Sequence, residues 1–407
     1  MSCRRALILL LLSTPSAVLL ASDAPTAKIA DQPNVSAKSA IAIDDRSGKI
    51  LWQKDADTAR FPASTTKIMT ALLFIESIGA NQVIQVPKDF PKDIPESSMH
   101  LQPGEKIKMV DLLYALMLRS ANDAAVLVGL EVAGSTPKFA TMMNNRAKQI
   151  GCTNTNFHNP NGLTDPLHTT SAHDLALIAR EAMKYPLFRE VVRTQRYKVA
   201  RDINTKDTLM VNRNKWLKKD QTADGIKTGY TVAAGHCYVG SATRNDFRVI
   251  TVVLDSAHWQ QDHEELLNWS FAHYGNQTLL EDKTKFGETK VANGETPLTY
   301  ENAHGITQVA TGPAFTKEIH LEPNLKAPIP EGAQVGEVVL TDADGFKVTR
   351  PLVAAATVKA IPPFGGSAVI LKASGLGLVS FAGVSVWRRR TKRYRLRPLR
   401  SIIRWRA

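Results

Sequence analysis

Cysteine is scarce in this chain, with three residues among 407. Cys3 belongs to a leader, residues 1–24, in which two arginines precede an apolar run and small residues, the pattern of a secretory signal peptide. An uncleaved membrane anchor is the alternative for this leader. Its removal would leave Cys152 and Cys237, which are too few for a disulfide-stapled fold. One bond between them is allowed in an oxidising compartment, but two buried packing thiols are favoured.

Acidic residues are absent from the last part of the chain, residues 388–407, which contains ten basic residues. The whole chain has 51 basic and 38 acidic residues and a net charge of +13. Without the ten basic residues of this last part, 41 basic and 38 acidic residues remain. Because the main body is nearly balanced in charge, we expect no nucleic-acid partner for it. The excess charge belongs to a basic tail.

A long apolar run lies directly before this tail. Residues 367–387 would rise about 31 Å as a helix, close to the hydrocarbon thickness of a bilayer. Lys372 is the only charge in the run, and Trp387 stands where the arginines begin. Since arginine favours the cytoplasmic side, we expect a transmembrane or membrane-anchor helix with a cytoplasmic tail. The main body would then lie on the periplasmic, extracytoplasmic side of the inner (cell) membrane. A helix in the membrane plane is the alternative.

Two parts with different sequence patterns lie between these ends. Residues 36–275 mix helical apolar periods with strand-like runs and predict an α/β (α+β) domain. Residues 276–362 have short β-like runs separated by glycine, proline and asparagine, and predict a small all-β domain. Helices are expected over 64–78, 110–119, 123–132, 171–183 and 261–274, two strands within 39–55, an edge strand at 224–231, and an antiparallel hairpin over 236–254.

A hydroxyl and an amine stand three residues apart at the start of an apolar helix, as Ser64 and Lys67 in FPASTTKIMTALLF. Their spacing puts both side chains on one face of the helix. They could be a nucleophile and its base, or part of an ordinary helix cap. A second copy, Ser135 and Lys138 with Pro137 between them, is predicted to be a cap with proline in the first turn. The Ser-x-x-Lys pattern alone is therefore weak evidence for catalysis.

Two further motifs follow in order along the chain. Ser120 and Asn122 stand two residues apart in a predicted break between helices, which directs both side chains from one turn toward the same side. Lys227, Thr228 and Gly229 lie on the predicted edge strand, where a backbone N–H is free and glycine lets a ligand approach closely. Three kinds of local structure could therefore converge on one cleft.

The segments PASTTK, RSANDAA and DGIKTGYT, in this order, make the chain resemble the serine-type D-alanyl-D-alanine carboxypeptidases, which are low-molecular-mass penicillin-binding proteins. The resemblance implies a β-lactamase-like catalytic domain over 36–275, with an antiparallel sheet and flanking helices. It also implies a β-sandwich over 276–362 between that domain and a C-terminal membrane anchor. The arginine tail differs from the short amphipathic anchor common in the family, which leaves the mode of membrane attachment open.

The resemblance implies a serine mechanism on the stem pentapeptide of peptidoglycan. Ser64 would attack the carbonyl of the penultimate D-alanine, and Lys67 would take its proton as a neutral amine. Ser120 would relay a proton to the leaving amine, and Asn122 would hold the substrate amide, although it could also cap the following helix. β-Lactams would acylate the serine as substrate mimics. No cofactor or metal is implied.

The edge strand would supply the rest of the site. The backbone N–H groups of the nucleophilic serine and of Tyr230 would form an oxyanion hole. Lys227 and Thr228 would meet the terminal carboxylate of the substrate, and Gly229 would give it room. Arg213, in VNRNK, stands where the family has a carboxylate-binding arginine, with a surface arginine as the alternative.

Other functions remain open on these residues. A β-lactamase shares the three motifs, and class A enzymes add a glutamate in E-x-x-L-N before Lys-Thr-Gly; here EELLN, residues 264–268, follows that motif and is interpreted as ordinary helix sequence. A D,D-endopeptidase or transpeptidase could use the same site, and a non-catalytic peptidoglycan-binding protein would need a broken motif set. His158, His168 and His173 invite a zinc interpretation, but their sequence context favours loop and cap chemistry.

Overall fold

The computed structural model of the protein describes residues 32–310 and 315–362. The predicted leader, apolar segment and basic tail lie outside these residues, so their assignments stay predictions. Among the helices of the described residues, none combines the length and the apolar character needed to span a bilayer.

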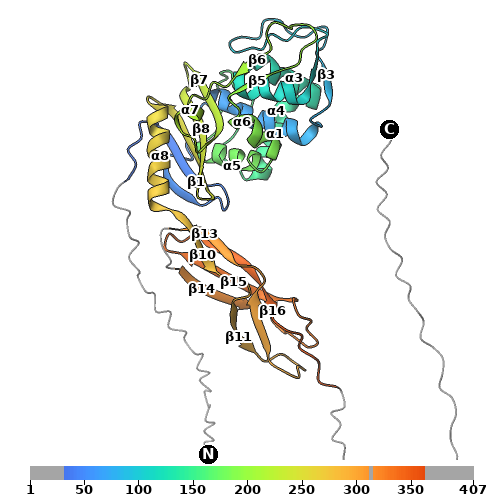
Figure 1. The fold of residues 1–407 in the computed structure, drawn as a ribbon, viewed down its shortest axis with the longest axis vertical. Helices are drawn as coiled ribbons and strands as arrows, with labels where there is room; N and C mark the ends of the chain where they lie inside the picture. Colours follow the sequence, from blue (N-terminus) through green and yellow to red (C-terminus); the bar gives the residue numbers. More distant parts are fainter. Residues whose placement is uncertain (1–31, 311–314, 363–407) are drawn as a thin grey trace, which may run out of the picture. The chain divides into compact units, whose positions relative to one another are not determined.

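An antiparallel sheet of five strands forms the centre of the first domain (Figure 1), in the order β2-β1-β9-β8-β7. The predicted hairpin over 236–254 is confirmed as the pair β8 and β9, and the predicted strand at 224–231 is confirmed as the edge strand β7. The strands are β1 (Ser39–Asp44), β2 (Ile50–Lys54), β7 (Ala223–Thr231), β8 (Gly235–Arg244) and β9 (Phe247–Ser256).

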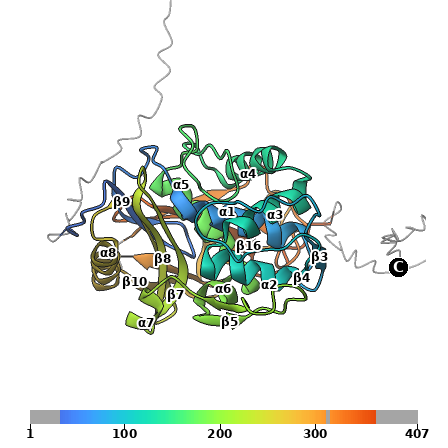
Figure 2. The same ribbon diagram turned by 90° about the horizontal axis from the view of Figure 1, so that it is seen from above.

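Both faces of this sheet are covered, and the alternation of side chains along the strands shows how. In β1, Ile41 and Ile43 join the large apolar cluster of the helical side, whereas Ala40 and Ala42 join the cluster beneath α8 (Trp259–His273). Successive side chains of a strand point to opposite faces, so a strand buried on both faces has this near-continuous apolar sequence. Figure 2 shows α8 on one side of β8 and β9, and α1, α5 and α6 on the other.

The helical side contains most of the helices predicted from the sequence. α5 packs on β1 and β9, α6 packs on β7, and α1 lies against α3 and α5. Two short hairpins flank these helices, β3 (Val83–Gln85) with β4 (Lys106–Lys108) and β5 (Arg196–Lys198) with β6 (Leu209–Val211). The helical elements are η1 (Ala63–Thr66), α1 (Lys67–Ser77), α2 (Met109–Tyr114), η2 (Ala115–Arg119), α3 (Asn122–Ala133), α4 (Thr136–Ile150), α5 (Ala172–Ala182), α6 (Pro186–Arg193) and α7 (Trp216–Lys219).

The second Ser-x-x-Lys copy is a helix cap, as predicted. Ser135 is the N-cap of α4, and its hydroxyl accepts a hydrogen bond from the backbone N–H of Lys138, with Pro137 in the first turn. Only the start of this helix was predicted, although its buried residues Phe139, Met143 and Ala147 recur at the four-residue spacing of a helix face.

The C-terminal part is all-β in its described residues, which confirms the predicted fold class. One antiparallel sheet has the order β11-β12-β16-β15-β14, and β10 pairs with β13 in a second sheet. Leu280 of β10 shares one apolar core with Val338 and Leu352 of the larger sheet. The strands are β10 (Gly275–Leu280), β11 (Lys285–Thr289), β12 (Leu298–Asn302), β13 (Ile306–Ala310), β14 (Phe315–Leu321), β15 (Gln334–Asp342) and β16 (Lys347–Ala354).

Candidate active site

Ser64 lies in η1, a single turn of 3-10 helix that leads into α1. The hydroxyl of Thr65 donates a hydrogen bond to the carbonyl of Pro62 at 2.7 Å, and the hydroxyl of Thr66 donates to the carbonyl of Ala63 at 2.9 Å. Threonine hydroxyls commonly bind backbone carbonyls three or four residues earlier, and here they brace the turn from within. Ala63 has a φ of +46°, a left-handed value that is unusual for a residue with a side chain. The structure therefore holds the serine on a braced and strained turn.

Two glycines let other segments pack tightly against this turn. A Cβ atom on Gly229 of β7 would lie 3.0 Å from the backbone nitrogen of Ser64. A Cβ atom on Gly162, whose φ is +85°, would lie 1.9 Å from the carbonyl oxygen of Ala63. A side chain at Gly162 would clash with the turn, and one at Gly229 would be closer than ordinary contact, so the turn is packed tightly between the edge strand and the loop over residues 157–163.

Lys67 is fully buried, and its side-chain nitrogen has three close neighbours. Nζ lies 3.0 Å from Ser64 Oγ, 2.7 Å from Asn122 Oδ1 and 2.6 Å from the carbonyl oxygen of Asn161. A neutral amine has two hydrogens and one lone pair, whereas the amide and carbonyl oxygens can only accept. When those two oxygens take both hydrogens, the lone pair is left for the hydroxyl of Ser64. The geometry is that of a base and its nucleophile.

The pKa of Lys67 favours this neutral form. Burial lowers its pKa well below the ordinary lysine value, and the nearby cations Lys227 and Arg213 lower it further. The carboxylates of Glu96 and Asp123 act in the opposite direction. Because burial dominates, the fraction of neutral amine at neutral pH is far larger than for an exposed lysine.

Lys227 is the second buried lysine of the site. Its Nζ donates a hydrogen bond to the carbonyl of Thr228 at 3.0 Å, and burial, with a smaller effect of Arg213, lowers its pKa to about 7. A lysine with this pKa is readily protonated when an anion arrives beside it, because the anion favours the charged form.

Ser120 lies where the helix predicted over 110–119 ends. That helix is α2 followed by the π-helical turn η2, after which Ser120 takes a left-handed φ of +63°. Its Oγ is buried, lines the same cavity as Ser64, and has no hydrogen-bond partner among the described residues. Buried hydroxyls are normally satisfied, so an unpartnered one that faces a cavity indicates a place for a ligand.

Asn122 begins α3, but its side chain does not cap the helix, so the cap interpretation was wrong. Its Oδ1 accepts from Lys67, and its Nδ2 donates to the carbonyl of Pro95 at 2.8 Å. Its backbone N–H donates to the carbonyl of Ser97 at 2.7 Å. Asn122 therefore links the base to the loop between β3 and β4.

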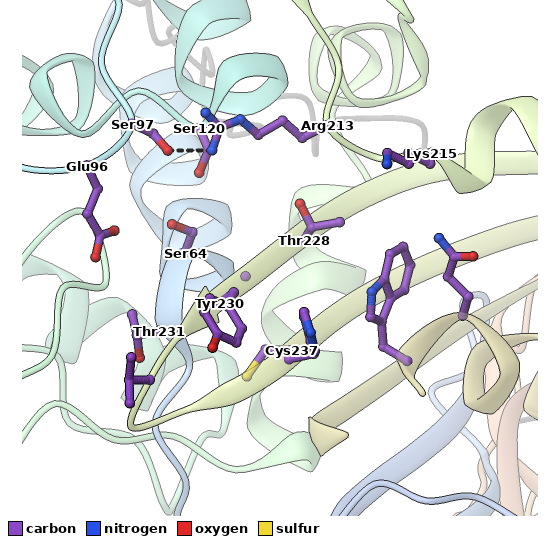
Figure 3. A pocket seen from close by; sticks show the side chains of 15 residues that line it. Ser64, Glu96, Ser97, Ser120, Arg213, Lys215, Thr228, Tyr230, Thr231 and Cys237 are labelled. Atoms are coloured by element: carbon purple, nitrogen blue, oxygen red, sulfur yellow. Dashed lines mark hydrogen bonds between the residues drawn. The ribbon is translucent and has the colours of Figure 1, made fainter. Parts of the chain in front are cut away.

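Arg213, Thr228 and Tyr230 line the cavity together with Ser64 (Figure 3). The guanidinium of Arg213 donates to the hydroxyl of Ser97, and both residues line the cavity. Burial and the nearby Arg119 lower the pKa of Arg213, although an arginine stays charged. The cavity has a volume of about 470 Å³ and is lined by Ser64, Glu96, Ser97, Ser120, Arg213, Lys215, Thr228, Gly229, Tyr230, Thr231, Val232, His236, Cys237, Trp259 and Gln260.

His168 connects the turn of the serine to the loop over 157–163, a connection that the sequence did not predict. Its Nε2 lies 2.9 Å from Thr66 Oγ1, and its Nδ1 accepts from the backbone nitrogens of His158 at 2.9 Å and Asn159 at 3.3 Å. Burial lowers its pKa to about 4, so the ring is neutral at physiological pH. His168 thereby fastens the loop whose Asn161 carbonyl contacts Lys67.

The other two histidines of this region make local contacts. His158 lies near Asp165 at 3.5 Å, and the Nδ1 of His173 lies 2.9 Å from Asp57. Across the described ranges, no three His, Cys, Asp or Glu side chains are grouped as a metal site would require. Glu264 of the EELLN segment lies on α8 and forms an ion pair at 2.6 Å with Lys219 of α7. It is not among the residues that line the cavity.

Both cysteines that follow the leader are free and buried, as predicted. Burial raises the pKa of Cys152 and of Cys237 to about 12. Neither is therefore a reactive thiolate at neutral pH, although Cys237 lines the cavity.

Comparison with known proteins extends these observations. Residues 26–258 match the peptidase family described as D-alanyl-D-alanine carboxypeptidase. The D-alanyl-D-alanine carboxypeptidase DacF of Bacillus subtilis is 31% identical over 86% of this chain and 91% of its own. DacC of Escherichia coli is 31% identical over 77% of this chain and 83% of its own.

Solved structures agree with this result. Penicillin binding protein 5 from Haemophilus influenzae has a TM-score of 0.68 and 27% identity, covering 81% of this chain and 99% of that one. The Streptomyces K15 DD-transpeptidase has a TM-score of 0.55 and 31% identity, covering 60% of this chain and 99% of that one. With its motifs gathered around one cavity and its relatives aligned over most of its length, the chain belongs to the D-alanyl-D-alanine carboxypeptidase family of serine peptidases.

Proposed function

We propose that this protein removes the terminal D-alanine from the stem pentapeptides of peptidoglycan through an acyl-enzyme on Ser64. The observation that carries the proposal is the buried Lys67 amine, 3.0 Å from Ser64 Oγ and held by two groups that can only accept hydrogen bonds. Membership of the carboxypeptidase family supports the same reaction.

The first half of the reaction forms the acyl-enzyme. Lys67 takes the proton of Ser64 as Oγ attacks the carbonyl carbon of the penultimate D-alanine. The N–H groups of Ser64 and Tyr230 stabilise the oxyanion. As the amide bond breaks, the nitrogen of the departing D-alanine takes a proton from the hydroxyl of Ser120, which has no other partner in the described structure, and Ser120 takes in its place the proton that Lys67 received from Ser64. Water then attacks the ester, releases the shortened stem peptide and restores the serine hydroxyl.

The terminal carboxylate of the substrate binds beside the edge strand. Arg213 and Thr228 both line the cavity, and the buried Lys227 lies next to Thr228 in β7. Paired cationic donors bind a carboxylate by charge-assisted hydrogen bonds. Asn122 holds the amide of the peptide with the hydrogen of Nδ2 that Pro95 does not take. β-Lactams enter the same cavity and acylate the same serine.

An assay of both products tests this function. Wild-type protein should release D-alanine from a pentapeptide that ends in D-alanyl-D-alanine, while benzylpenicillin should label it covalently and be hydrolysed slowly. Rapid penicillin hydrolysis without D-alanine release would identify a β-lactamase instead. Because a similar structure is that of a DD-transpeptidase, an added amine acceptor should be included, and transfer in preference to hydrolysis would favour that activity.

We also propose that the protein is exported by its leader and attached to the inner membrane by residues 367–387, with the catalytic domain in the periplasm. The apolar run and the arginines after it support this proposal. A chain that ends at Pro363 should be recovered as soluble enzyme that still binds penicillin, whereas the full chain should sediment with membranes. Retention of the truncated chain on membranes after a high-salt wash would contradict the proposed anchor.

A further inference from the structure

One carboxylate stands among the residues that line the active-site cavity. Arg213 and Lys215 are cationic lining residues, and Glu96 is the acidic one. In Figure 3, Glu96 and Thr228 lie on opposite sides of Ser64. If the terminal carboxylate of the substrate lies toward Thr228 of the edge strand, the part of the peptide that stays on the serine extends toward Glu96.

The backbone on both sides of Glu96 is fixed by one residue of the site. Asn122 donates from its side chain to the carbonyl of Pro95 and from its backbone to the carbonyl of Ser97. Between these two bonds, Glu96 takes a left-handed φ of +66°, which is uncommon for a residue with a side chain. Because both neighbours are bound to Asn122, the position of Glu96 is coupled to Lys67, which Asn122 also contacts.

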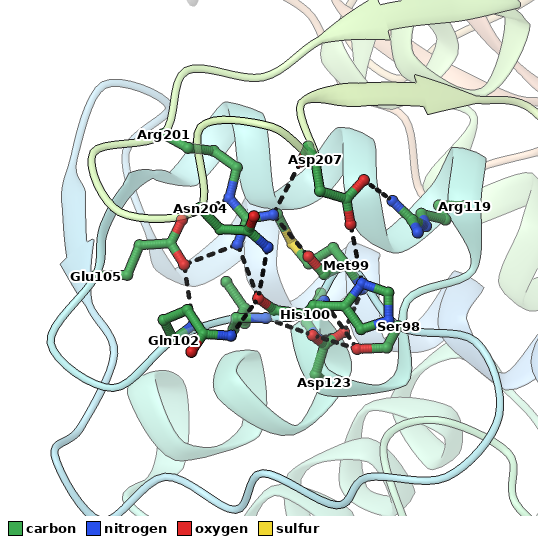
Figure 4. A network of polar contacts seen from close by, with 12 residues as sticks. Ser98, Met99, His100, Gln102, Glu105, Arg119, Asp123, Arg201, Asn204 and Asp207 are labelled. Atoms are coloured by element: carbon green, nitrogen blue, oxygen red, sulfur yellow. Dashed lines mark hydrogen bonds and ion pairs between the residues drawn. The ribbon is translucent and has the colours of Figure 1, made fainter.

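The loop that follows Glu96 is anchored equally firmly (Figure 4). The carboxylate of Asp123 accepts hydrogen bonds from the backbone nitrogens of Met99 at 3.0 Å and Leu101 at 2.9 Å, and from the hydroxyl of Ser98 at 2.7 Å.

A fully buried ion pair completes the anchor. Arg201 Nε lies 2.6 Å from Glu105, and its Nη1 donates to the carbonyl of Met99 at 2.6 Å. The backbone of such a loop is already ordered in the free protein, so ligand binding costs little additional backbone entropy.

The side chain of Glu96 has no hydrogen bond or ion pair within the described residues, although its anchored neighbours have several. Burial lowers the pKa of Lys67 and of Arg213, and the charge of Glu96 offsets part of this lowering in both. The structure thus presents an unpaired carboxylate on an anchored backbone, at the side of the cavity toward which the acyl part of the substrate extends in the proposed reaction.

We propose that Glu96 is a subsite for a cationic amine on the side chain of the residue that precedes D-alanyl-D-alanine. This inference rests on the proposed carboxypeptidase function and adds a selectivity to it. A carboxylate recognises an ammonium group by a charge-assisted hydrogen bond, whereas a neutral acylated side chain gains no such bond. The protein should therefore discriminate between stem peptides with a free and a blocked amine at that residue.

Two tripeptides and two variants test the subsite. The peptides are Nα-acetyl-Lys-D-Ala-D-Ala, with a free ε-amine, and the Nα,Nε-diacetyl form, and kcat/KM for D-alanine release is measured for both. Wild-type enzyme should prefer the free amine by about threefold to tenfold, as expected for a partly exposed ion pair. In Glu96→Gln the ratio of the two values should fall to about one. The matched control Glu131→Gln, an exposed glutamate on α3, should keep the wild-type ratio and rates.

Each outcome of this experiment decides a different point. No D-alanine release from either peptide by wild-type enzyme would overturn the proposed function itself. Release from both peptides without preference, or a preference that survives Glu96→Gln, would overturn the subsite alone. An equal loss of rate on both peptides in Glu96→Gln would also overturn it, because the carboxylate would then act on the reacting groups. Added salt should reduce the wild-type preference if charge is its cause.

Discussion

Ser64→Ala should lose both D-alanine release and covalent labelling by penicillin. The hydroxyl oxygen is the atom that becomes acylated, and no other hydroxyl in the described structure contacts the buried amine of Lys67. Loss of the nucleophile from such a unit lowers the rate by ~10⁴ to 10⁶. Single-turnover labelling followed by mass measurement of the intact protein would detect any remaining acylation.

The chain contains its own control for this experiment. Ser135→Ala alters the second Ser-x-x-Lys copy, which is only the cap of α4. That variant should label and turn over like the wild type, with a loss of stability of about 1 kcal/mol from the missing cap. Labelled Ser64→Ala protein would show that a different residue is the nucleophile.

Lys67→Arg should have the second largest effect, because it keeps the positive charge and removes the base. A guanidinium stays protonated up to very high pH, so it cannot take the proton of Ser64. Loss of a general base lowers the acylation rate by ~10² to 10⁴. Lys138→Arg, in the capping copy, is the matched control and should acylate normally.

The pH dependence of the wild-type enzyme follows from the same two lysines. The lowered pKa of Lys67 means that its neutral fraction, and with it the acylation rate, rises as pH increases through that pKa. The pKa of Lys227 is lowered to about 7, so kcat/KM should fall again above this pH as the cation that meets the substrate carboxylate is lost. A rate in Lys67→Arg that follows the wild-type profile would show that another group is the base.

Much of the site was predictable because the spacing of residues along a helix or a strand determines which side chains point the same way. The pair Ser64 and Lys67 is separated by nearly one helical turn, and Lys227, Thr228 and Gly229 lie on an edge strand that the sequence pattern identified. The structure brings all three motifs to one cavity or its wall. These predictions needed only local geometry together with the order of the motifs.

The parts that could not be predicted depend on contacts between segments distant in sequence. His168 is 102 residues from Thr66, and nothing in its own neighbourhood indicates that partner. The left-handed backbone of Glu96 lies between two residues that are both bound by Asn122, which is far along the chain. The π-helical turn before Ser120 likewise has no distinct sequence signal, because its apolar residues continue the helical spacing of those in α2.

The close packing of Gly162 and Gly229 on the serine turn has a consequence for inactivation by heat. Since one glycine belongs to a loop of the helical side and the other to the sheet, the turn stays in place only while both halves of the domain remain assembled. Penicillin labelling should therefore disappear in the same transition as the tertiary structure, rather than at a lower temperature. The fraction of protein that penicillin can acylate should therefore measure the fraction in which the whole catalytic domain is folded.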